Sequence, residues 1–191
     1  MASRGLDINN IMKHRKKLGI EMGRVSAEEY KTLPKSGIVV VLDNVRSAHN
    51  VGSVFRSADS FKADRLVLCG ICATPPSAEI HKSALGAEFS VEWEHYDNTM
   101  DAIAKLHAEG YEILCVEQAV DSIMLDRFTP VPGKRYALVF GNEVDGVAQE
   151  VIEAADGVIE IPQYGTKHSL NISVSAGIIL WHFRPRQENS I

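Results

Sequence analysis

Three polar stretches of the chain hold the residue types from which a site for chemistry could be built. The first, "LDNVRSAHNVGSVFRSADSF" (residues 42–61), contains Asn50 and, six residues later, Arg56. The second is "GNEVDG" (141–146), where Glu143 lies between two glycines. The third, "IPQYGTKHSLN" (161–171), ends on Ser169 and Asn171. Amides, a hydroxyl and a carboxylate can orient a polar ligand, and a guanidinium can clamp a phosphate.

These stretches follow short apolar runs rich in β-branched residues, which are typical of strands buried on both faces. Such runs occupy residues 37–44, 65–70, 111–117, 135–142 and 157–162. Helical patterns separate most of them, at residues 50–61, about 98–109, about 146–155 and 169–183. The alternation predicts an α/β fold with a mostly parallel sheet and helices on both faces. Because ligands of such sheets bind beyond the carboxyl ends of the strands, the polar stretches are expected at one edge.

Arg56 is predicted to point away from the local core. One face of a helix over residues 50–61 is apolar at about 100° per residue, and it consists of Val51, Val54, Phe55, Ala58 and Phe61. Arg56 lies nearly opposite and therefore faces solvent, a cleft or another subunit. A solvated arginine is one explanation. Asn50 could likewise merely cap the helix, and Gly52 could serve a close backbone approach.

The other two stretches also have simple structural explanations. "GNEVDG" could be a glycine-rich turn with surface acids, or Gly141 could let a ligand approach the strand end beside Glu143. Ser169 could cap the helix that follows it. That helix, from Ile172 to Phe183, is apolar or small nearly all round, so it must be buried within the domain or across a dimer interface.

The composition predicts one soluble, intracellular domain. Of 191 residues, 45% are hydrophobic and 24% charged, as in ordinary globular proteins. No apolar stretch approaches the roughly eighteen residues that span a bilayer, and the N-terminus does not resemble a secretory signal. Three cysteines without a framework spacing favour reduced thiols and a cytoplasmic location.

The net charge of −5 is unevenly distributed. Residues 1–36 carry eight Lys/Arg against four Asp/Glu, whereas the remainder carries twelve against twenty-one. A basic arm centred on "KHRKK" (13–17) would suit a segment that follows phosphates, although a solvated helix end would look the same.

Several other site classes lack their sequence signal. Cys69 and Cys72 form one C-x-x-C with His81 as a conceivable third ligand, but this is half a zinc site, and we expect no metal. Dinucleotide, triphosphate and nucleophile-elbow motifs do not occur in the sequence.

Taken together and in this order, the three stretches resemble the motifs of the SpoU/TrmH family of RNA ribose 2′-O-methyltransferases. The similarity rests on Asn50, Gly52 and Arg56 after a strand, on "LVFGNEVDGV", and on "IPQYGTKHSLNISVSAG". It covers about residues 38–183. The segment "VEQA" (116–119) is most similar to the tRNA-modifying branch.

The resemblance implies a SPOUT-type fold with a C-terminal trefoil knot, bound S-adenosylmethionine, and a homodimer acting on tRNA or rRNA. A guanosine is the favoured target, with the tRNA D-loop guanosine as the best single choice. The expected domains are a basic helical arm (1–36) that contacts RNA and a methyltransferase domain (37–191).

Site roles follow from the resemblance by position. The cofactor residues would be Glu117, Gly141, Asn142, Ile161 and Leu170. The catalytic residues would be Asn50, Arg56, Glu143, Ser169 and Asn171. RNA contacts are expected from Lys13, Arg15, Lys16, Lys17 and Arg46.

Methyl transfer from a sulfonium needs in-line approach but no metal, so positioning should contribute much of the rate. Whether Arg56 acts as the base or as a phosphate clamp stays open. Alternatives are methylation of another ribose or of a base, and a catalytically silent RNA-binding module. A Rossmann-type dehydrogenase lacks its glycine fingerprint.

Overall fold

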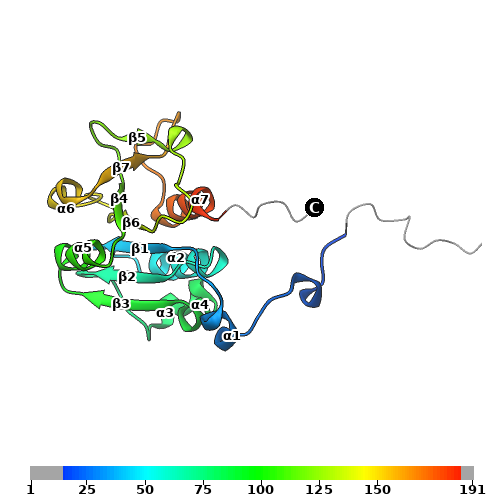
Figure 1. The fold of residues 1–191 in the computed structure, drawn as a ribbon. Coiled ribbons are helices and arrows are strands. Elements are labelled where there is room, and N and C mark those ends of the chain that lie inside the picture. The colour runs from blue at the N-terminus through cyan, green and yellow to red at the C-terminus, as the bar shows by residue number, and fades with distance from the viewer. Residues whose placement is uncertain (1–14, 186–191) are drawn as a thin grey trace, which may run out of the picture.

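The computed structural model describes residues 15–185, and a seven-stranded parallel sheet forms its centre (Figure 1). The strands are β1 (Ile38–Asp43), β2 (Arg65–Cys69), β3 (Glu92–Tyr96), β4 (Glu112–Val116), β5 (Ile123–Met124), β6 (Tyr136–Phe140) and β7 (Gly157–Glu160). Their order is β3-β2-β1-β6-β4-β7-β5, and every neighbouring pair is parallel. The predicted α/β fold with a mostly parallel sheet is confirmed.

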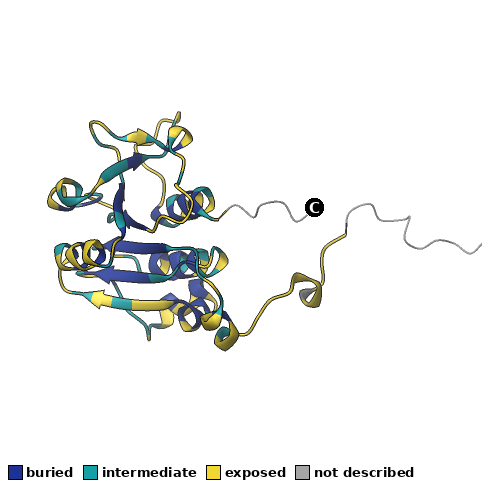
Figure 2. Cartoon of the chain, viewed as in Figure 1, coloured by how far each residue is buried: buried dark blue, intermediate teal, exposed yellow. Residues whose placement is uncertain are grey.

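Helices cover both faces of the sheet. They are α1 (Ala27–Thr32), α2 (Ala48–Ser60), α3 (Ala78–Ala84), α4 (Ala87–Ser90), α5 (Thr99–Ala108), α6 (Gln149–Ala154) and α7 (Ile172–Phe183). Alternate residues of β1 enter two separate cores: Val40 and Leu42 pack with α2, α3 and α7, whereas Val39 and Val41 pack with α5 and α6. Burial on both faces explains why β1 is one continuous apolar run, dark blue in Figure 2.

Two strands were not predicted from the sequence. β3 is an edge strand with the sequence EWEHY, and most of its side chains are exposed, as the yellow ribbon in Figure 2 shows. Charged side chains are common on edge strands, where they discourage pairing with other chains, so the apolar signal is missing. β5 has only two residues, which is too short for any periodic pattern.

Helix starts differ from the prediction in two places. α2 begins at Ala48 with Ser47 as its N-cap, so the expectation that Asn50 could cap this helix is wrong. α7 begins at Ile172, and its cap is Asn171 rather than Ser169. In both cases a short polar side chain close in sequence to the predicted cap accepts a backbone N–H of the first turn. Ser47 accepts that of Asn50, and Asn171 accepts that of Ser173.

The single chain does not bury α7 wholly within its own domain, and burial across a dimer interface, the other predicted arrangement, stays a prediction. Its inner face is buried, but Val174, Ile178 and Trp181 are 49%, 37% and 57% exposed. The apolar surface of α7 is therefore larger than the area that its own domain buries. Across residues 15–185, no helix combines the length and apolar character needed to cross a membrane.

Only part of the expected helical arm (1–36) lies among the described residues. The described part has a short 3-10 helix (Gly19–Met22) and α1, while residues 7–14 lie outside the described residues. Tyr30 holds α1 against α2, because its hydroxyl donates to the carbonyl of Asp59 over 3.0 Å. Residues 15–26 lie away from the sheet in Figure 1 and are mostly exposed.

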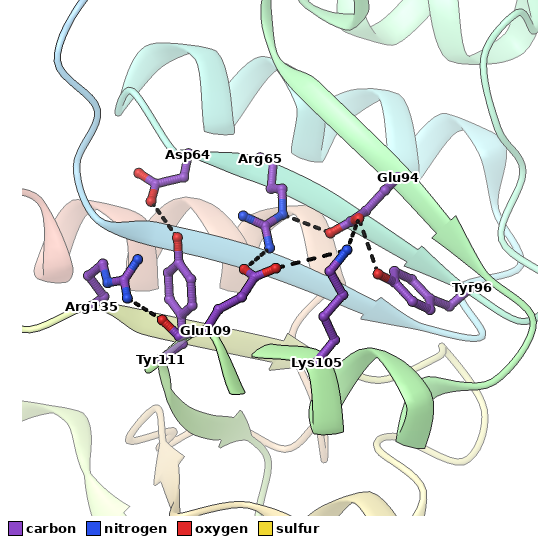
Figure 3. A network of polar contacts seen from close by, with 8 residues as sticks. All are labelled: Asp64, Arg65, Glu94, Tyr96, Lys105, Glu109, Tyr111 and Arg135. Atoms are coloured by element: carbon purple, nitrogen blue, oxygen red, sulfur yellow. Dashed lines mark hydrogen bonds and ion pairs between the residues drawn. The ribbon is translucent and has the colours of Figure 1, made fainter. Parts of the chain in front are cut away.

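A polar network fixes the amino ends of the strands (Figure 3). Arg65 contacts two carboxylates, Glu94 at 2.7 Å and Glu109 at 2.5 Å. The hydroxyl of Tyr111 donates to Asp64 over 2.8 Å, and the guanidinium of Arg135 lies 4.5 Å from the centre of the Tyr111 ring. This network lies near the amino ends of the strands, whereas the three polar stretches follow the carboxyl ends. It therefore does not engage the side chains of the polar stretches.

Candidate active site at the carboxyl edge of the sheet

The loops after β4 and β6 and the segment before α7 enclose a cavity of about 530 Å³. All five residues expected to bind the cofactor line it, namely Glu117, Gly141, Asn142, Ile161 and Leu170. Three of the expected catalytic residues also line it: Glu143, Ser169 and Asn171. The structure therefore brings the second and third polar stretches together around one space.

The loop after β6 is held by its own side chain and backbone. Asn142 Oδ1 accepts the backbone N–H groups of Val144 and Asp145 at 3.0 and 2.9 Å. The backbones of Asn142 and Gly146 exchange two hydrogen bonds of 3.1 Å. A Cβ at Gly141 would lie only 1.9 Å from the carbonyl carbon of Gly146. The close approach that Gly141 permits is thus to its own loop, although the residue also lines the cavity.

The end of β4 connects this loop to the third stretch. The Glu117 carboxylate accepts the backbone N–H of Val147 over 3.0 Å and that of Gln118 over 2.8 Å. The Gln118 side chain donates to the carbonyl of His168 over 2.7 Å. Gln118 also lines the cavity, and sequence reasoning did not select it. Its position directly after a buried strand was the signal that could have identified it.

A chain of hydrogen bonds joins all three polar stretches. Asn50 Nδ2 donates to Glu143 Oε1 over 2.7 Å, and Asn171 Nδ2 donates to Asn50 Oδ1 over 3.3 Å. The Glu143 carboxylate also accepts the backbone N–H groups of Arg46 and Ser47 at 3.2 and 3.3 Å. Asn50 does not itself line the cavity, but it orients Glu143 and Asn171, which do.

The hydrogen bonds to Glu143 favour its ionised form. Partial burial by itself would raise the pKa of this carboxyl, but the bonds from Asn50, Arg46 and Ser47 stabilise the ionised form more strongly. The pKa of Glu143 therefore lies below its ordinary value. Glu117 and Asp145 add two further carboxyl groups to the cavity wall, so the cavity suits a ligand with positive charge.

Arg56 lies on the exposed side of α2, opposite the buried Val51, Val54 and Phe55, as its helical position predicts. It does not line the cavity of its own chain. Gly52 allows α2 to contact α3, because a Cβ there would lie 2.4 Å from the carbonyl oxygen of Ile80.

The expected RNA-binding cations fall in different environments. Arg15 pairs with Glu21 through bonds of 2.6 and 2.8 Å, whereas Lys16 and Lys17 are exposed. Lys13 lies outside the described residues. Arg46 is exposed and lines a second, smaller hollow beside the cavity.

Cys69 and Cys72 serve the fold. Burial raises the pKa of the Cys69 thiol to about 12 and that of Cys72 to about 11. Cys72 Sγ accepts the backbone N–H of Val45 and donates to the carbonyl of Leu42. His81 instead contacts Glu88 at 2.5 Å, and no group of three metal-ligating side chains assembles within residues 15–185.

Comparison with known proteins relates this arrangement to a family. Residues 37–181 match the model of the SpoU rRNA Methylase family. The chain is 33% identical over 153 residues to a tRNA (guanosine(18)-2′-O)-methyltransferase of Aquifex aeolicus. The aligned region covers 79% of this chain and 70% of that protein. It is also 33% identical over 163 residues to the 23S rRNA (guanosine-2′-O-)-methyltransferase RlmB of Nitrosomonas europaea, covering 83% of this chain and 60% of that protein.

Two solved structures of methyltransferases have folds similar to that of this chain. The AdoMet-bound rRNA methyltransferase from Sinorhizobium meliloti has a TM-score of 0.73 at 28% identity, covering 81% of this chain and 59% of that one. The TrmH/SpoU tRNA modifying enzyme of A. aeolicus has a TM-score of 0.71 at 30% identity, covering 82% and 78%. This chain thus spans less than two thirds of the N. europaea and S. meliloti proteins. The resemblance drawn from the three stretches is confirmed, and the protein belongs to the SpoU rRNA methylase family.

Proposed function

We propose that the protein is an S-adenosylmethionine-dependent RNA methyltransferase that acts on the ribose 2′-hydroxyl of a guanosine in tRNA or rRNA. The observation that carries this proposal is that Glu143 and Asn171 line the cavity and that Asn50, which does not line it, holds both through hydrogen bonds. The relatives named for guanosine 2′-O-methylation of tRNA and of 23S rRNA support the same activity and leave the RNA undecided between these two classes.

The cavity fits the cofactor chemically. Apolar side chains, including Phe140, Ile161 and Leu170, offer contacts for an adenine ring, while the carboxylates of Glu117 and Glu143 suit a sulfonium and an ammonium. S-adenosylmethionine, when bound, supplies an activated methyl group. The contribution of the chain is to hold that group and the ribose hydroxyl in line, which by itself can account for a large rate increase.

Each catalytic residue then has a positioning task. Asn50 fixes Glu143 and Asn171 at the cavity wall, and Ser169, which is exposed on the neighbouring loop, offers its hydroxyl to the ribose. Arg56 binds an RNA phosphate beside the target nucleotide. A guanidinium is nearly always protonated, so this clamp is physically easier than direct proton removal.

We further propose a homodimer and a C-terminal trefoil knot. The exposed Val174, Ile178 and Trp181 give α7 an apolar outer face, which a second copy would cover. Arg56 of the partner subunit would then reach the cavity that Arg56 does not line in its own chain. The knot rests on family membership, and it would place the segments around 141–146 and 161–171 in a fixed relation.

The proposed division of labour assigns residues 1–36 to RNA contact and residues 37–191 to methyl transfer. The family match begins at residue 37, which supports this boundary. Lys16 and Lys17 are exposed cations in the described part of the arm, and their contribution to RNA binding should depend strongly on salt.

Two measurements test the proposal. Calorimetry with S-adenosylmethionine should show binding without added metal. Incubation of the protein and labelled S-adenosylmethionine with RNA from a strain lacking the gene should then yield 2′-O-methylguanosine on nucleoside mass spectrometry. Cofactor binding without any methyl transfer to tRNA or rRNA would favour a catalytically silent RNA-binding module, and a methylated base would move the reaction off the ribose.

A further inference from the structure

A second hollow of about 370 Å³ adjoins the cofactor cavity. Asn142, Asp145 and Gly146 line both spaces, so only the loop after β6 separates them. The remaining walls come from the carboxyl ends of β1 and β2 and the start of α6. Nothing in the methyl-transfer proposal uses this second hollow, which shares the loop after β6 with the cofactor cavity.

The polar side chains at the floor of the hollow are already hydrogen-bonded within the protein. Asp43 is only 1% exposed, and its carboxylate accepts from Thr99 Oγ1 at 2.6 Å, Asn44 Nδ2 at 2.9 Å and the Ala148 N–H at 2.9 Å. Asn44 Oδ1 accepts the Ile71 N–H at 3.3 Å. These groups are engaged with one another, so they shape the space without being available to recognise a ligand.

The rim, in contrast, presents two charged side chains of opposite sign. Arg46 and Asp145 both line the hollow and are both exposed. Their side chains form no ion pair or hydrogen bond with each other or with any other described residue. Ile71, which is 61% exposed, adds an apolar surface beside them. A ligand for this rim must carry acceptors for a guanidinium, donors for a carboxylate and a flat apolar face.

We infer that this hollow receives the guanine base of the target nucleotide, an inference that rests on the proposed function. Guanine has N7 and O6 as adjacent acceptors, which an arginine binds with both arms of its fork. Its N1–H and N2 amino group form a pair of donors that match the two oxygens of a carboxylate. Arg46 would bind the first edge and Asp145 the second, with the base against Ile71.

The other bases fit this rim less well. Adenine places an acceptor, N1, where guanine has a donor, so Asp145 would face a lone pair. A pyrimidine lacks the adjacent N7 and O6 acceptors that Arg46 would bind with both arms of its fork. A site built to pair with both edges rejects a base that leaves one of its groups unpaired. The hollow therefore gives a physical reason for choosing guanosine over the other three nucleosides.

The experiment compares wild type with Arg46→Gln and Asp145→Asn on RNA from a strain lacking the gene, at saturating S-adenosylmethionine. Asp101→Asn and Arg127→Gln, which change exposed residues elsewhere, are the matched controls. Wild type and controls should form 2′-O-methylguanosine alone. Each rim variant should form it about 10-fold more slowly or worse, because a bidentate base contact is lost.

A second measurement separates base recognition from a general structural effect. With inosine at the methylated position the N2 donor is missing, so wild type should slow markedly while Asp145→Asn should show a much smaller guanosine-to-inosine difference. Equal discrimination by wild type and Asp145→Asn, or rim variants as fast as wild type, would overturn the inference while leaving the methyltransferase intact. Methylation by wild type at another nucleoside would overturn it as well. No methyl transfer by wild type would instead refute the proposed function, and this inference with it.

Discussion

The side-chain amide of Asn171 donates to Oδ1 of Asn50 over 3.3 Å, although 121 positions separate the two residues. The side-chain amide of Asn50 in turn donates a hydrogen bond of 2.7 Å to the carboxylate of Glu143. Each member is oriented by the next, so the geometry of the cavity wall depends on all three. Loss of one bond should therefore affect catalysis more than it affects folding.

Asn171→Asp tests this relationship. The aspartate can still cap α7 by accepting the Ser173 N–H, so stability should change little. It cannot donate to Asn50, and the resulting misalignment should slow single-turnover methyl transfer by roughly 100-fold. Asn98→Asp, at the N-cap of α5, makes the same chemical change away from the site. Equal activity of the two variants in the methylation assay would show that the bond to Asn50 has no catalytic role.

Glu143 should make stability depend on pH in acid. Because its pKa in the folded protein lies below the ordinary 4.5, its contribution is complete above that value and is lost as pH falls through the folded pKa. Urea unfolding of wild type and Glu143→Gln, from neutral pH down to about pH 3, should show a shallower decline for the variant. Glu150→Gln, an exposed change on α6, serves as the control. Parallel curves for all three proteins would contradict the prediction.

Periodicity and strand ends predicted much of the fold and where several residues of the candidate site lie. The apolar face of α2 placed Arg56 outward, and the rule that ligands bind at strand carboxyl ends placed Glu143 and Asn171 near one another. The strand order was beyond reach, because β6 lies between β1 and β4 through contacts distant in sequence. The hydrogen bonds of Asn50 also depend on tertiary structure, since local sequence made it equally suitable as a helix cap.

Gly52→Ala should destabilise the protein although alanine favours helices. The new Cβ would lie 2.4 Å from the Ile80 carbonyl oxygen and 2.1 Å from Ser83 Oγ, so α2 and α3 would have to move apart. Such overpacking costs about 1–3 kcal/mol in the free energy of unfolding. Adding Ser83→Ala should not restore stability, because the Ile80 contact is with backbone. Ser60→Ala, at the exposed end of the same helix, is the control in urea unfolding.

Ile178→Asp should separate dimerisation from cofactor binding. A charge on the outer face of α7 would prevent a second copy from covering Val174 and Trp181, so light scattering should change from about twice the 21.0 kDa chain mass to one chain mass. The cavity lies within one chain, so S-adenosylmethionine should still bind. Val120→Asp, at an apolar residue that is 92% exposed elsewhere, should remain dimeric. A wild-type monomer that methylates RNA would refute the shared site.

Arg56→Ala should remove chemistry without removing the fold. Arg56 lies opposite the buried face of α2 and outside the cofactor cavity of its chain, so stability and S-adenosylmethionine affinity should stay near wild type. The methylation rate should fall by orders of magnitude even at saturating RNA, because RNA bound without the phosphate clamp would not hold its ribose hydroxyl in line with the methyl group.

Neutralising Lys16 and Lys17 should weaken RNA binding but leave the methylation rate at saturating RNA largely unchanged. These exposed cations would act on RNA capture, so Lys16→Gln with Lys17→Gln should weaken binding and flatten its dependence on salt, because fewer counterions are released. Saturating RNA should then largely restore the rate. Single-turnover methylation against RNA concentration distinguishes the two variants directly. If Arg56→Ala reached a near-normal rate at saturation, Arg56 would be a surface cation of the same kind as the lysines, and the clamp would have to be sought elsewhere along the dimer surface.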